Sequence, residues 1–600
     1  MADTAGQASS SNTLPATSSS SSPSSSSSPL PNIYVVHFPL SHPTFRFPVF
    51  RSVAQEYSIP LRFYPLPSDS QPFSLSYQDI LDSYDAAYQP ENDAGRPFAI
   101  VSLPSDREAA LLLEKCSVVK SITHLWAAGS TITGLLSALR QPSSERIYDA
   151  LRPTSLTWKA EVAAIGVKQS QEDKNRIIES LGFLAFQGPV NLKSPHFELV
   201  WWEERWGLSG AAIPQQNEDA SMNDQLRLAI AGRRITLPRG VMPARDWIER
   251  LDLKKRTYIG NTSMEAEMSL NHAQMALSSP ASGSGGKIVY DPFVGTGSLL
   301  IACAAMGAYV FGSDIDGRMM RGKADKGDRN AETGIKKAAK QYGLQDKFLD
   351  CLTFDITQHP WRIAREAPSS TTSCSAGCSC SCASASSSRK QQGFLDAVVA
   401  DPPYGVRAGA KRLGHRDVNK QRSEPYWLEE KQGWSHEQED YIPPTRPYAL
   451  NDLLDDLLRF SAGLVKDGGR LVFWMPVMNE DEGESRTEVP DGGKEWELVA
   501  VSTQDFGKWA RRLVTMQRRP RSLSCTCQQA STTSSAAPTP PFSSISSSTS
   551  SSGTSSLPYP STDSTARISD RHTQFHQESG RFRANVDQAD FRNQFFRSSK

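Results

Sequence analysis

Residues 287–298 read Lys-Ile-Val-Tyr-Asp-Pro-Phe-Val-Gly-Thr-Gly-Ser, an apolar strand that enters a glycine loop, and the apolar run 299–306 follows. A strand, a glycine loop and a helix in this order are typical of the nucleotide-binding unit of a doubly wound parallel sheet. The glycines allow the backbone to approach a ligand closely. No Gly-Lys-Ser/Thr follows, which excludes a P-loop, and Leu300 stands where a dinucleotide fingerprint has its third glycine.

The alternation of strands and helices continues on both sides of this loop. Further strands are predicted over 308–314, 394–400 and 471–474, and helices over 264–276, 318–334 and 453–465. This alternation predicts an α/β domain with a doubly wound parallel sheet, whose ligands bind at the carboxyl ends of the strands. We therefore expect one edge of the sheet to carry the carboxylates that follow predicted strands, namely Asp291, Asp314, Asp355 and Asp401.

The string Asp291-Pro292-Phe293 before the glycines makes this loop similar to the S-adenosylmethionine loop of amino-methyltransferases. Gly295 and Gly297 would face the cofactor, Asp314 would accept hydrogen bonds from its ribose hydroxyls, and Asp355 would accept from its adenine amine. Asp316 is an alternative to Asp314 for the ribose. Each of these acids could instead be a helix N-cap, a position that Asp favours.

The tetrad Asp401-Pro402-Pro403-Tyr404 follows the apolar strand 394–400 and is suited to methylating an exocyclic amine of a nucleobase. Such an amine is a poor nucleophile, because its lone pair is delocalised into the ring. The Asp401 carboxylate and the Pro402 carbonyl could each accept one N–H, which would aim the lone pair at the methyl donor. The prolines stiffen the turn, and Tyr404 offers a face for a flipped base. The alternative is an ordinary turn after a strand.

The 600 residues divide by composition. We expect a disordered Ser/Pro-rich tail (1–30), a mixed α+β region (31–240), a basic linker (241–257), the sheet domain (258–525, with a Cys/Ser-rich insertion at 366–392) and a second disordered tail (526–600). Lys+Arg and Asp+Glu both total 65, which excludes nucleic-acid binding by bulk charge alone. In the front region, strands are predicted over 33–38, 61–64 and 98–103, and helices around 51–57 and over 106–116.

Cysteines and apolar runs limit the remaining classes of function. Cys374, Cys378, Cys380 and Cys382 lie in the insertion without the paired arms of a structural zinc site, so we expect no metal. The same holds for Cys525 and Cys527. No apolar run reaches membrane-spanning length and no signal segment is present, so we expect no membrane association and a cytoplasmic location.

Several blocks together resemble the catalytic subunit of the eukaryotic tRNA (guanine(10)-N2)-methyltransferases, a THUMP-domain class I methyltransferase family. The blocks are 253–264, 291–300, 401–405, 122–126, 186–189 and 509–513. The resemblance implies a ferredoxin-like and THUMP RNA-binding region over 31–240 before a class I Rossmann-like methyltransferase domain. It also implies S-adenosyl-L-methionine as the cofactor, tRNA as the substrate and a small zinc-binding activator protein as partner in a heterodimer.

The same resemblance assigns the remaining residues. Thr262 and Ser263 would close over the methionine end of the cofactor. The basic residues Lys254, Lys255, Arg256, Arg511 and Arg512 could contact tRNA phosphate or could be solvated charges. Two alternatives stay open: an adenine N6-type methyltransferase acting on RNA or DNA, and a non-catalytic RNA-binding protein. The tetrad suits adenine as well as guanine.

Overall fold

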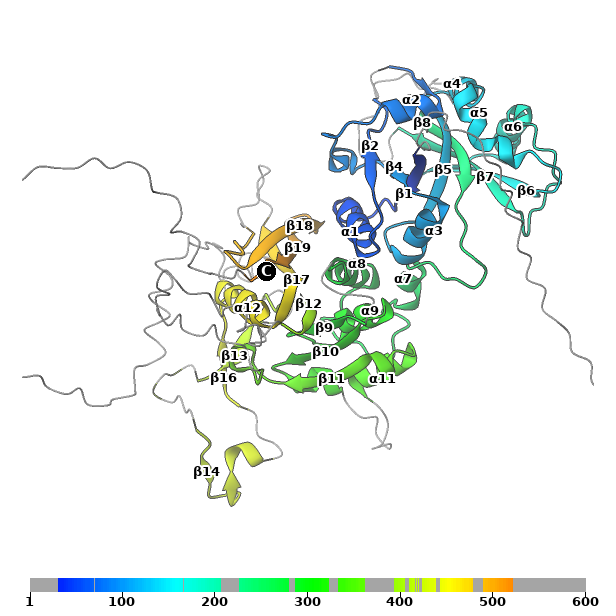
Figure 1. Cartoon of the computed structure of the whole chain (residues 1–600). Helices are drawn as coiled ribbons and strands as arrows, with labels where there is room; N and C mark the ends of the chain where they lie inside the picture. The colour runs from blue at the N-terminus through cyan, green and yellow to red at the C-terminus, as the bar shows by residue number, and fades with distance from the viewer. Residues whose placement is uncertain are drawn as a thin grey trace, which may run out of the picture.

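The computed structural model describes residues 31–68, 71–165, 167–206, 226–279, 286–322, 333–361, 393–404, 409–415, 417, 419, 424–438, 443–478 and 489–521. The two tails and the insertion at 366–392 lie outside these residues. So do the cysteines considered above, Cys374, Cys378, Cys380, Cys382, Cys525 and Cys527. The described chain forms two lobes, a front lobe built on one sheet and a second lobe built on another (Figure 1).

The second lobe contains the predicted doubly wound sheet. Its seven strands follow the order β11-β10-β9-β12-β17-β19-β18. The pairs from β11 to β17 are parallel, and β19 is antiparallel to both β17 and β18. The strands are β9 (Ile288–Asp291), β10 (Tyr309–Asp314), β11 (Phe348–Thr353), β12 (Leu395–Ala400), β17 (Val465–Met478), β18 (Trp496–Asp505) and β19 (Trp509–Arg518). The strand order reverses between β9 and β12, which is where such sheets bind their ligands.

Helices α8 (Ala266–Leu277), α9 (Ser298–Ala305), α10 (Gly317–Arg321), α11 (Gly334–Gln341) and α12 (Leu450–Leu464) flank this sheet. One expectation was wrong: 318–334 is not a single helix. α10 ends at Arg321, and Gly322 follows in the left-handed region with φ 67°. Such a glycine ends a helix, because it allows the chain to turn away from the axis.

The front lobe consists of a single eight-stranded mixed sheet. Its order is β2-β4-β1-β5-β8-β7-β6, with β3 paired to β5. The strands are β1 (Asn32–His37), β2 (Arg62–Tyr64), β3 (Ser74–Leu75), β4 (Phe98–Leu103), β5 (Ser121–Gly129), β6 (Trp158–Ile165), β7 (Phe197–Arg205) and β8 (Leu226–Arg234). Its helices are α1 (Pro43–Glu56), α2 (Tyr77–Asp82), α3 (Asp106–Lys115), α4 (Ile132–Leu139), α5 (Pro142–Tyr148) and α6 (Gln171–Ser180). The pairing of β5 with β8 joins its earlier and later halves.

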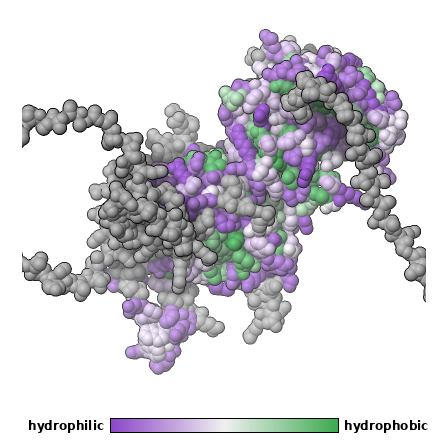
Figure 2. All heavy atoms as spheres, in the orientation of Figure 1, coloured by the Kyte–Doolittle hydropathy of each residue, from purple (hydrophilic) through white to green (hydrophobic). Residues whose placement is uncertain are grey.

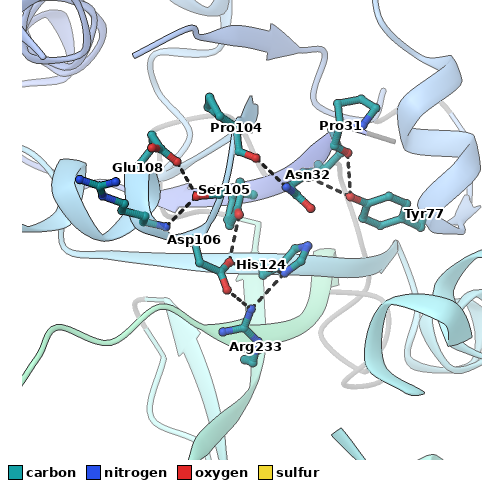
Figure 3. A network of polar contacts seen from close by, with 12 residues as sticks. Pro31, Asn32, Tyr77, Pro104, Ser105, Asp106, Glu108, His124 and Arg233 are labelled. Atoms are coloured by element: carbon teal, nitrogen blue, oxygen red, sulfur yellow. Dashed lines mark hydrogen bonds and ion pairs between the residues drawn. The ribbon is translucent and has the colours of Figure 1, made fainter. Parts of the chain in front are cut away.

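A polar network lies across that β5–β8 junction (Figure 3). Asp106, the first residue of α3, accepts hydrogen bonds from Arg233 of β8 at 2.5 Å and from Tyr34 of β1 at 3.0 Å. Arg233 also contacts His124 of β5 at 3.3 Å. Burial lowers the pKa of His124 to about 4, so the ring is neutral and can accept from the arginine. One carboxylate thus connects both halves of the sheet.

The two lobes share a continuous core. Helix α1 of the front lobe packs against α8 and β18 of the second lobe, and one hydrophobic cluster contains residues from both (Figure 1). Phe45 of α1 contacts Trp474 of β17 at 5.9 Å between ring centroids, and Lys287 pairs with Glu56 at 2.6 Å. The region predicted as a basic linker, 241–257, contains α7 (Asp246–Arg250), which packs on α8. The lobes therefore meet through packed helices.

Helix α1 is longer than the helix predicted around 51–57. It begins at Pro43 and continues through Pro48. Proline has no N–H to donate to the carbonyl four residues earlier, and its ring pushes that carbonyl outward. The Thr44 carbonyl instead accepts from the Ser502 hydroxyl of β18 at 3.0 Å. Thr44 and Thr503 exchange two further hydrogen bonds, of 2.8 and 2.9 Å. The defect in α1 is thus used to join the lobes.

The remaining elements are small. Strand β13 (Lys411–Leu413) pairs with β16 (Thr445–Pro447), and β14 (Trp427–Leu428) pairs with β15 (Gly433–Trp434) in a hairpin that stands away from both lobes (Figure 1). The face shown in Figure 2 is predominantly hydrophilic, with small hydrophobic patches on both lobes. Short 3-10 helices are η1 (Pro90–Asp93), η2 (Asp149–Leu151), η3 (Gly182–Leu184), η4 (Gln345–Lys347), η5 (Ile356–Gln358) and η9 (Ser435–Glu437). Among the described residues, no helix combines the length and the apolar character that crossing a membrane requires.

The Ser502 hydroxyl donates to the Thr44 carbonyl, which Pro48 leaves without its helical donor, so the effects of changing Ser502 and Pro48 should be coupled. Ser502→Ala should lower the free energy of unfolding by about 1 kcal/mol, because the Thr44 carbonyl loses its donor. In a Pro48→Ala background the same change should cost markedly less, since residue 48 regains an N–H that can reach Thr44. Urea denaturation of the wild type, both single variants and the double variant measures the coupling. Additive costs would show that the two sites are independent.

Candidate active site

The glycine loop and the tetrad are brought together by the pairing of β9 with β12. Val289 pairs with Ala397 and Tyr290 with Val398 in parallel register. Asp291 ends β9, and Asp401 directly follows β12, so both carboxylates lie at the carboxyl edge of the sheet where the strand order reverses. Phe293 and Tyr404 pack against the same hydrophobic cluster. The structure therefore places the predicted donor loop next to the predicted acceptor site.

The glycine loop has the backbone geometry that its sequence suggests. Gly295 and Gly297 both lie in the left-handed region, with φ of 51° and 79°, where residues with a Cβ are strained. A Cβ on Gly295 would meet nothing nearer than the Thr262 hydroxyl at 3.8 Å, so there is open space above this residue. A Cβ on Gly312 of β10 would lie 2.4 Å from the Asp291 carbonyl. Gly312, which the sequence analysis missed, allows the loop to cross β10 closely.

Asp314 and Asp316 take different positions. The Asp314 carboxylate, at the end of β10, accepts from the backbone N–H groups of Gly295 and Asp316, both at 2.8 Å. Burial raises its pKa. Asp316 lies at the rim, caps α10 at the Arg318 N–H and pairs with the Arg318 side chain at 2.7 Å. Of the two alternatives, the N-cap therefore describes Asp316, and Asp314 is the acid beside the glycine loop.

Asp355 is also a cap. Its Oδ1 accepts from the Thr357 N–H at 2.8 Å and hydroxyl at 2.9 Å, and its Oδ2 accepts from the Leu413 N–H at 2.5 Å. The residue is buried. Oδ1 thus accepts two hydrogen bonds within the protein and Oδ2 accepts one, so a second lone pair of Oδ2 is left for the adenine amine, and that role stays a prediction. Asp355 also fixes η5 and β13 at the edge of the site.

Asp291 is fully buried, and burial raises its pKa well above the usual range. The nearby Asp314 and Asp401 carboxylates raise it further, while the Phe293 N–H at 2.8 Å opposes the shift. Three acidic groups thus share one end of the sheet, which disfavours charge on Asp291. The edge where the strands end is electronegative and suits a cationic or hydrogen-bond-donating ligand.

The tetrad itself lies at the surface of this edge. Asp401, Pro403 and Tyr404 are half-buried and Pro402 is buried. Tyr404 forms an isolated antiparallel bridge with Gly409. The tetrad is therefore anchored by its strand on one side and by this bridge on the other.

The turn that contains Thr262 and Ser263 is attached to the glycine loop. The Ser263 hydroxyl accepts from the Gly260 N–H at 2.9 Å and contacts the Thr296 hydroxyl at 2.8 Å. The Met264 N–H donates to the Ser298 hydroxyl at 3.2 Å. Thr296 and Ser298 were missed by the sequence analysis, although both lie within the quoted loop. Thr262 is exposed beside Gly295, at the open space above the loop.

The basic residues divide into two groups. Lys254 and Lys255 are exposed, and Lys255 pairs with Glu249 on the surface at 2.9 Å. Arg256 is buried, and its guanidinium donates to the Thr296 carbonyl and to the Ser298 hydroxyl. The Arg256 side chain is therefore directed into the protein, unlike those of its two basic neighbours.

Arg511 and Arg512 lie on β19. The Arg511 guanidinium stacks over Trp474 at 4.3 Å and donates to Gln504 at 2.7 Å, and Gln504 in turn donates to Glu265 at 2.7 Å. Glu265 directly precedes α8. Arg511 thus supports the 262–265 turn from the far strands of the sheet. Arg512 is half-buried, and burial lowers its pKa. Within the described residues, no group of three His, Cys, Asp or Glu side chains is placed to hold a metal ion.

Two family models match this chain. The model described as "Tmrp11 THUMP N-terminal domain" matches residues 86–220, and the model described as "RMKL-like, methyltransferase domain" matches residues 254–418. The second match spans the glycine loop and the tetrad.

Curated relatives match most of the chain. The tRNA (guanine(10)-N(2))-methyltransferase of Saccharomyces cerevisiae is 33% identical over 423 residues, which are 70% of this chain and 84% of the relative. The Homo sapiens protein named tRNA (guanine(10)-N(2))-methyltransferase TRMT11 is 33% identical over 435 residues, 70% of this chain and 80% of the relative. The chain belongs to the tRNA (guanine(10)-N(2))-methyltransferase family. A third member, from Schizosaccharomyces pombe, is 28% identical over 82% of this chain and 90% of its own length.

Membership of this family confirms the resemblance of the sequence blocks, the methyltransferase class and the THUMP part of the front lobe.

Among solved structures, TrmN from Thermus thermophilus aligns with a TM-score of 0.33 and 16% identity, covering 81% of this chain and 99% of that one.

The buried carboxylates of this methyltransferase predict a pH-dependent gain in stability. An Asp whose folded pKa is raised destabilises the native state as pH rises from its unfolded value, about 3.9, through the folded value. Asp291→Asn removes that penalty, so the variant should melt above the wild type at pH 8, and the difference should shrink at pH 4. Thermal unfolding at both values, with the exposed Asp346→Asn as control, measures this. A difference independent of pH would contradict a buried charge on Asp291.

Proposed function

We propose that this chain transfers a methyl group from S-adenosyl-L-methionine to the exocyclic N2 amine of guanosine 10 in tRNA. The observation that supports this most directly is the meeting of the glycine loop and the tetrad where β9 pairs with β12. That position juxtaposes a donor loop with a group that can hold an amine. The base and its position in tRNA are taken from the names of the curated relatives.

The residues around the glycine loop fit the proposed cofactor. The space above Gly295 allows a ligand to lie against the backbone. Asp314 lies beside it, and each of its oxygens has a lone pair beyond the bond it already accepts, so it can take a ribose hydroxyl. Thr262 and Ser263 bound the same space from the other side. Asp291 and Phe293 set the shape of the loop through their 2.8 Å hydrogen bond. S-adenosyl-L-methionine, when bound, would supply an electrophilic methyl group.

The tetrad would supply orientation. The guanine amine donates two hydrogen bonds, and two acceptors at the end of β12, the Asp401 carboxylate and the Pro402 carbonyl, would take them. Holding both hydrogens pulls the nitrogen out of conjugation with the ring and points its lone pair toward the donor loop. Pro403 stiffens the turn, so these acceptors keep their geometry. Tyr404, packed on the cluster that also contacts Phe293, would stack on the base after it leaves its helix.

The proposal includes partners. Lys254 and Lys255 are the exposed basic residues at the start of the methyltransferase domain and would contact tRNA phosphate. The small zinc-binding activator would dock on exposed apolar surface of that domain; Leu349 of β11 and Phe394 before β12 are both exposed there. The division into a front RNA-binding region (31–240), a linker (241–257) and a methyltransferase domain (258–525), together with a cytoplasmic location, belongs to the same proposal.

One assay tests the reaction. The full chain, alone and with the activator, is incubated with unmodified tRNA and labelled donor, and the modified nucleoside is mapped. N2-methylguanosine at position 10 is expected. Methyladenosine would support the adenine alternative, and no product with either preparation would support a non-catalytic RNA-binding protein.

Asp401→Ala should lower the rate of methyl transfer by at least about 10²-fold, because it removes one of two acceptors aimed at the reacting amine. Donor affinity, measured by calorimetry, should stay within about threefold, since the carboxylate acts on the acceptor. The exposed Asp346→Ala should change neither quantity. Transfer at the wild-type rate by the Asp401 variant would refute the assigned role.

A further inference from the structure

Arg256 is a buried cation with no carboxylate partner among the described residues. It is 8% exposed, and its guanidinium donates to the Thr296 carbonyl and, at 2.9 Å, to the Ser298 hydroxyl. Its Nε has no hydrogen-bond partner within the described part of the chain. Burial lowers its pKa to about 10, so it remains charged at neutral pH. A buried charge of this kind is unfavourable unless something compensates it.

The position of Arg256 adds to this uncompensated positive charge. Ser298 is the first residue of α9, so the guanidinium lies at the positive end of that helix. The N-cap residue is Gly297, which has no side chain to accept from the first-turn N–H groups. A cation and an uncapped helix start thus lie behind the same loop, and an anion in front of the loop would compensate both.

The opposite side of the glycine loop has the opposite charge. Asp291, Asp314 and Asp401 lie at the strand ends, and burial together with repulsion by the other two carboxylates raises the pKa of Asp291. A ligand bound along this loop therefore meets an acidic side and a basic side. S-adenosylmethionine has the matching polarity: its sulfonium and ribose hydroxyls suit the acids, and its carboxylate is its one anionic group.

We infer that Arg256, acting through Thr296 and Ser298, is the positioning residue that selects the carboxylate of the methyl donor and thereby fixes the direction in which the donor lies. This rests on the proposed function, because it assumes S-adenosylmethionine as the ligand. Arg256 does not touch the donor in this arrangement. It holds the Thr296–Ser298 backbone in place and adds positive potential at the start of α9.

The test compares two ligands that differ by one group, S-adenosylmethionine and decarboxylated S-adenosylmethionine, by calorimetry on the full chain without tRNA. The wild type should prefer the carboxylated ligand. Arg256→Met should weaken S-adenosylmethionine by about tenfold or more and leave the decarboxylated ligand within about threefold. Arg256→Lys, which keeps the charge, should recover part of the preference. Arg250→Met removes an exposed arginine that stacks on Trp247 and should change neither affinity.

Ser298→Ala provides a second variant that does not empty the buried site. It removes one of the two acceptors of Arg256 and should weaken S-adenosylmethionine by about threefold with little effect on the decarboxylated ligand. Equal losses for both ligands, or no loss, in variants that melt like the wild type would overturn the inference. If Arg256→Met does not fold, the Ser298→Ala result decides. A wild type that binds neither ligand overturns the proposed function itself, whereas one that binds both equally overturns only the role of Arg256.

Discussion

The pairing of β9 with β12 is the contact on which the site depends. It places the carboxyl end of the strand that enters the glycine loop beside the carboxyl end of the strand that enters the tetrad. Strand order reverses at this pair, so helices leave toward opposite faces and the edge between them stays open. The glycine loop and the tetrad, which lie more than a hundred positions apart in sequence, thus meet without either having to reach across the sheet.

Repulsion between the carboxylates at this edge destabilises the folded protein. Asp291, Asp314 and Asp401 converge at one edge, and Asp291 is fully buried. Backbone N–H groups of Phe293, Gly295 and Asp316 compensate part of the repulsion. The remaining repulsion destabilises the folded protein, and a ligand with positive charge at this edge would relieve it. Functional sites often lower the stability of the folded protein in this way, because they are shaped for a ligand and not for the empty state.

Sequence predicted the elements whose signal is local. The apolar strands that end in Asp291, Asp314 and Asp401, and the glycines between strand and helix, carry their own pattern, so the fold and the tetrad could be predicted. The capping role of Asp355 could not, because a cap and a ligand acceptor require the same residue type, and its contact with the distant Leu413 N–H has no local signal. Arg256 stands in a basic run whose other members are exposed, and burial of one member has no signal in composition.

The joint between the lobes explains why polar residues are buried on α8. Helix α8 is buried along nearly its whole length, although it contains Asn271, His272 and Gln274. Gln274 accepts from the Ser117 hydroxyl at 2.7 Å and donates to the Lys115 carbonyl, both in the front lobe, while His272 contacts the Val472 carbonyl at 2.9 Å in the sheet. Polar residues on α8 therefore mark where two partners meet it. The Thr262–Ser263 turn leads directly into α8 and contacts the glycine loop. One helix therefore holds both the front lobe and this turn, and a displacement of either lobe would reach the glycine loop through it.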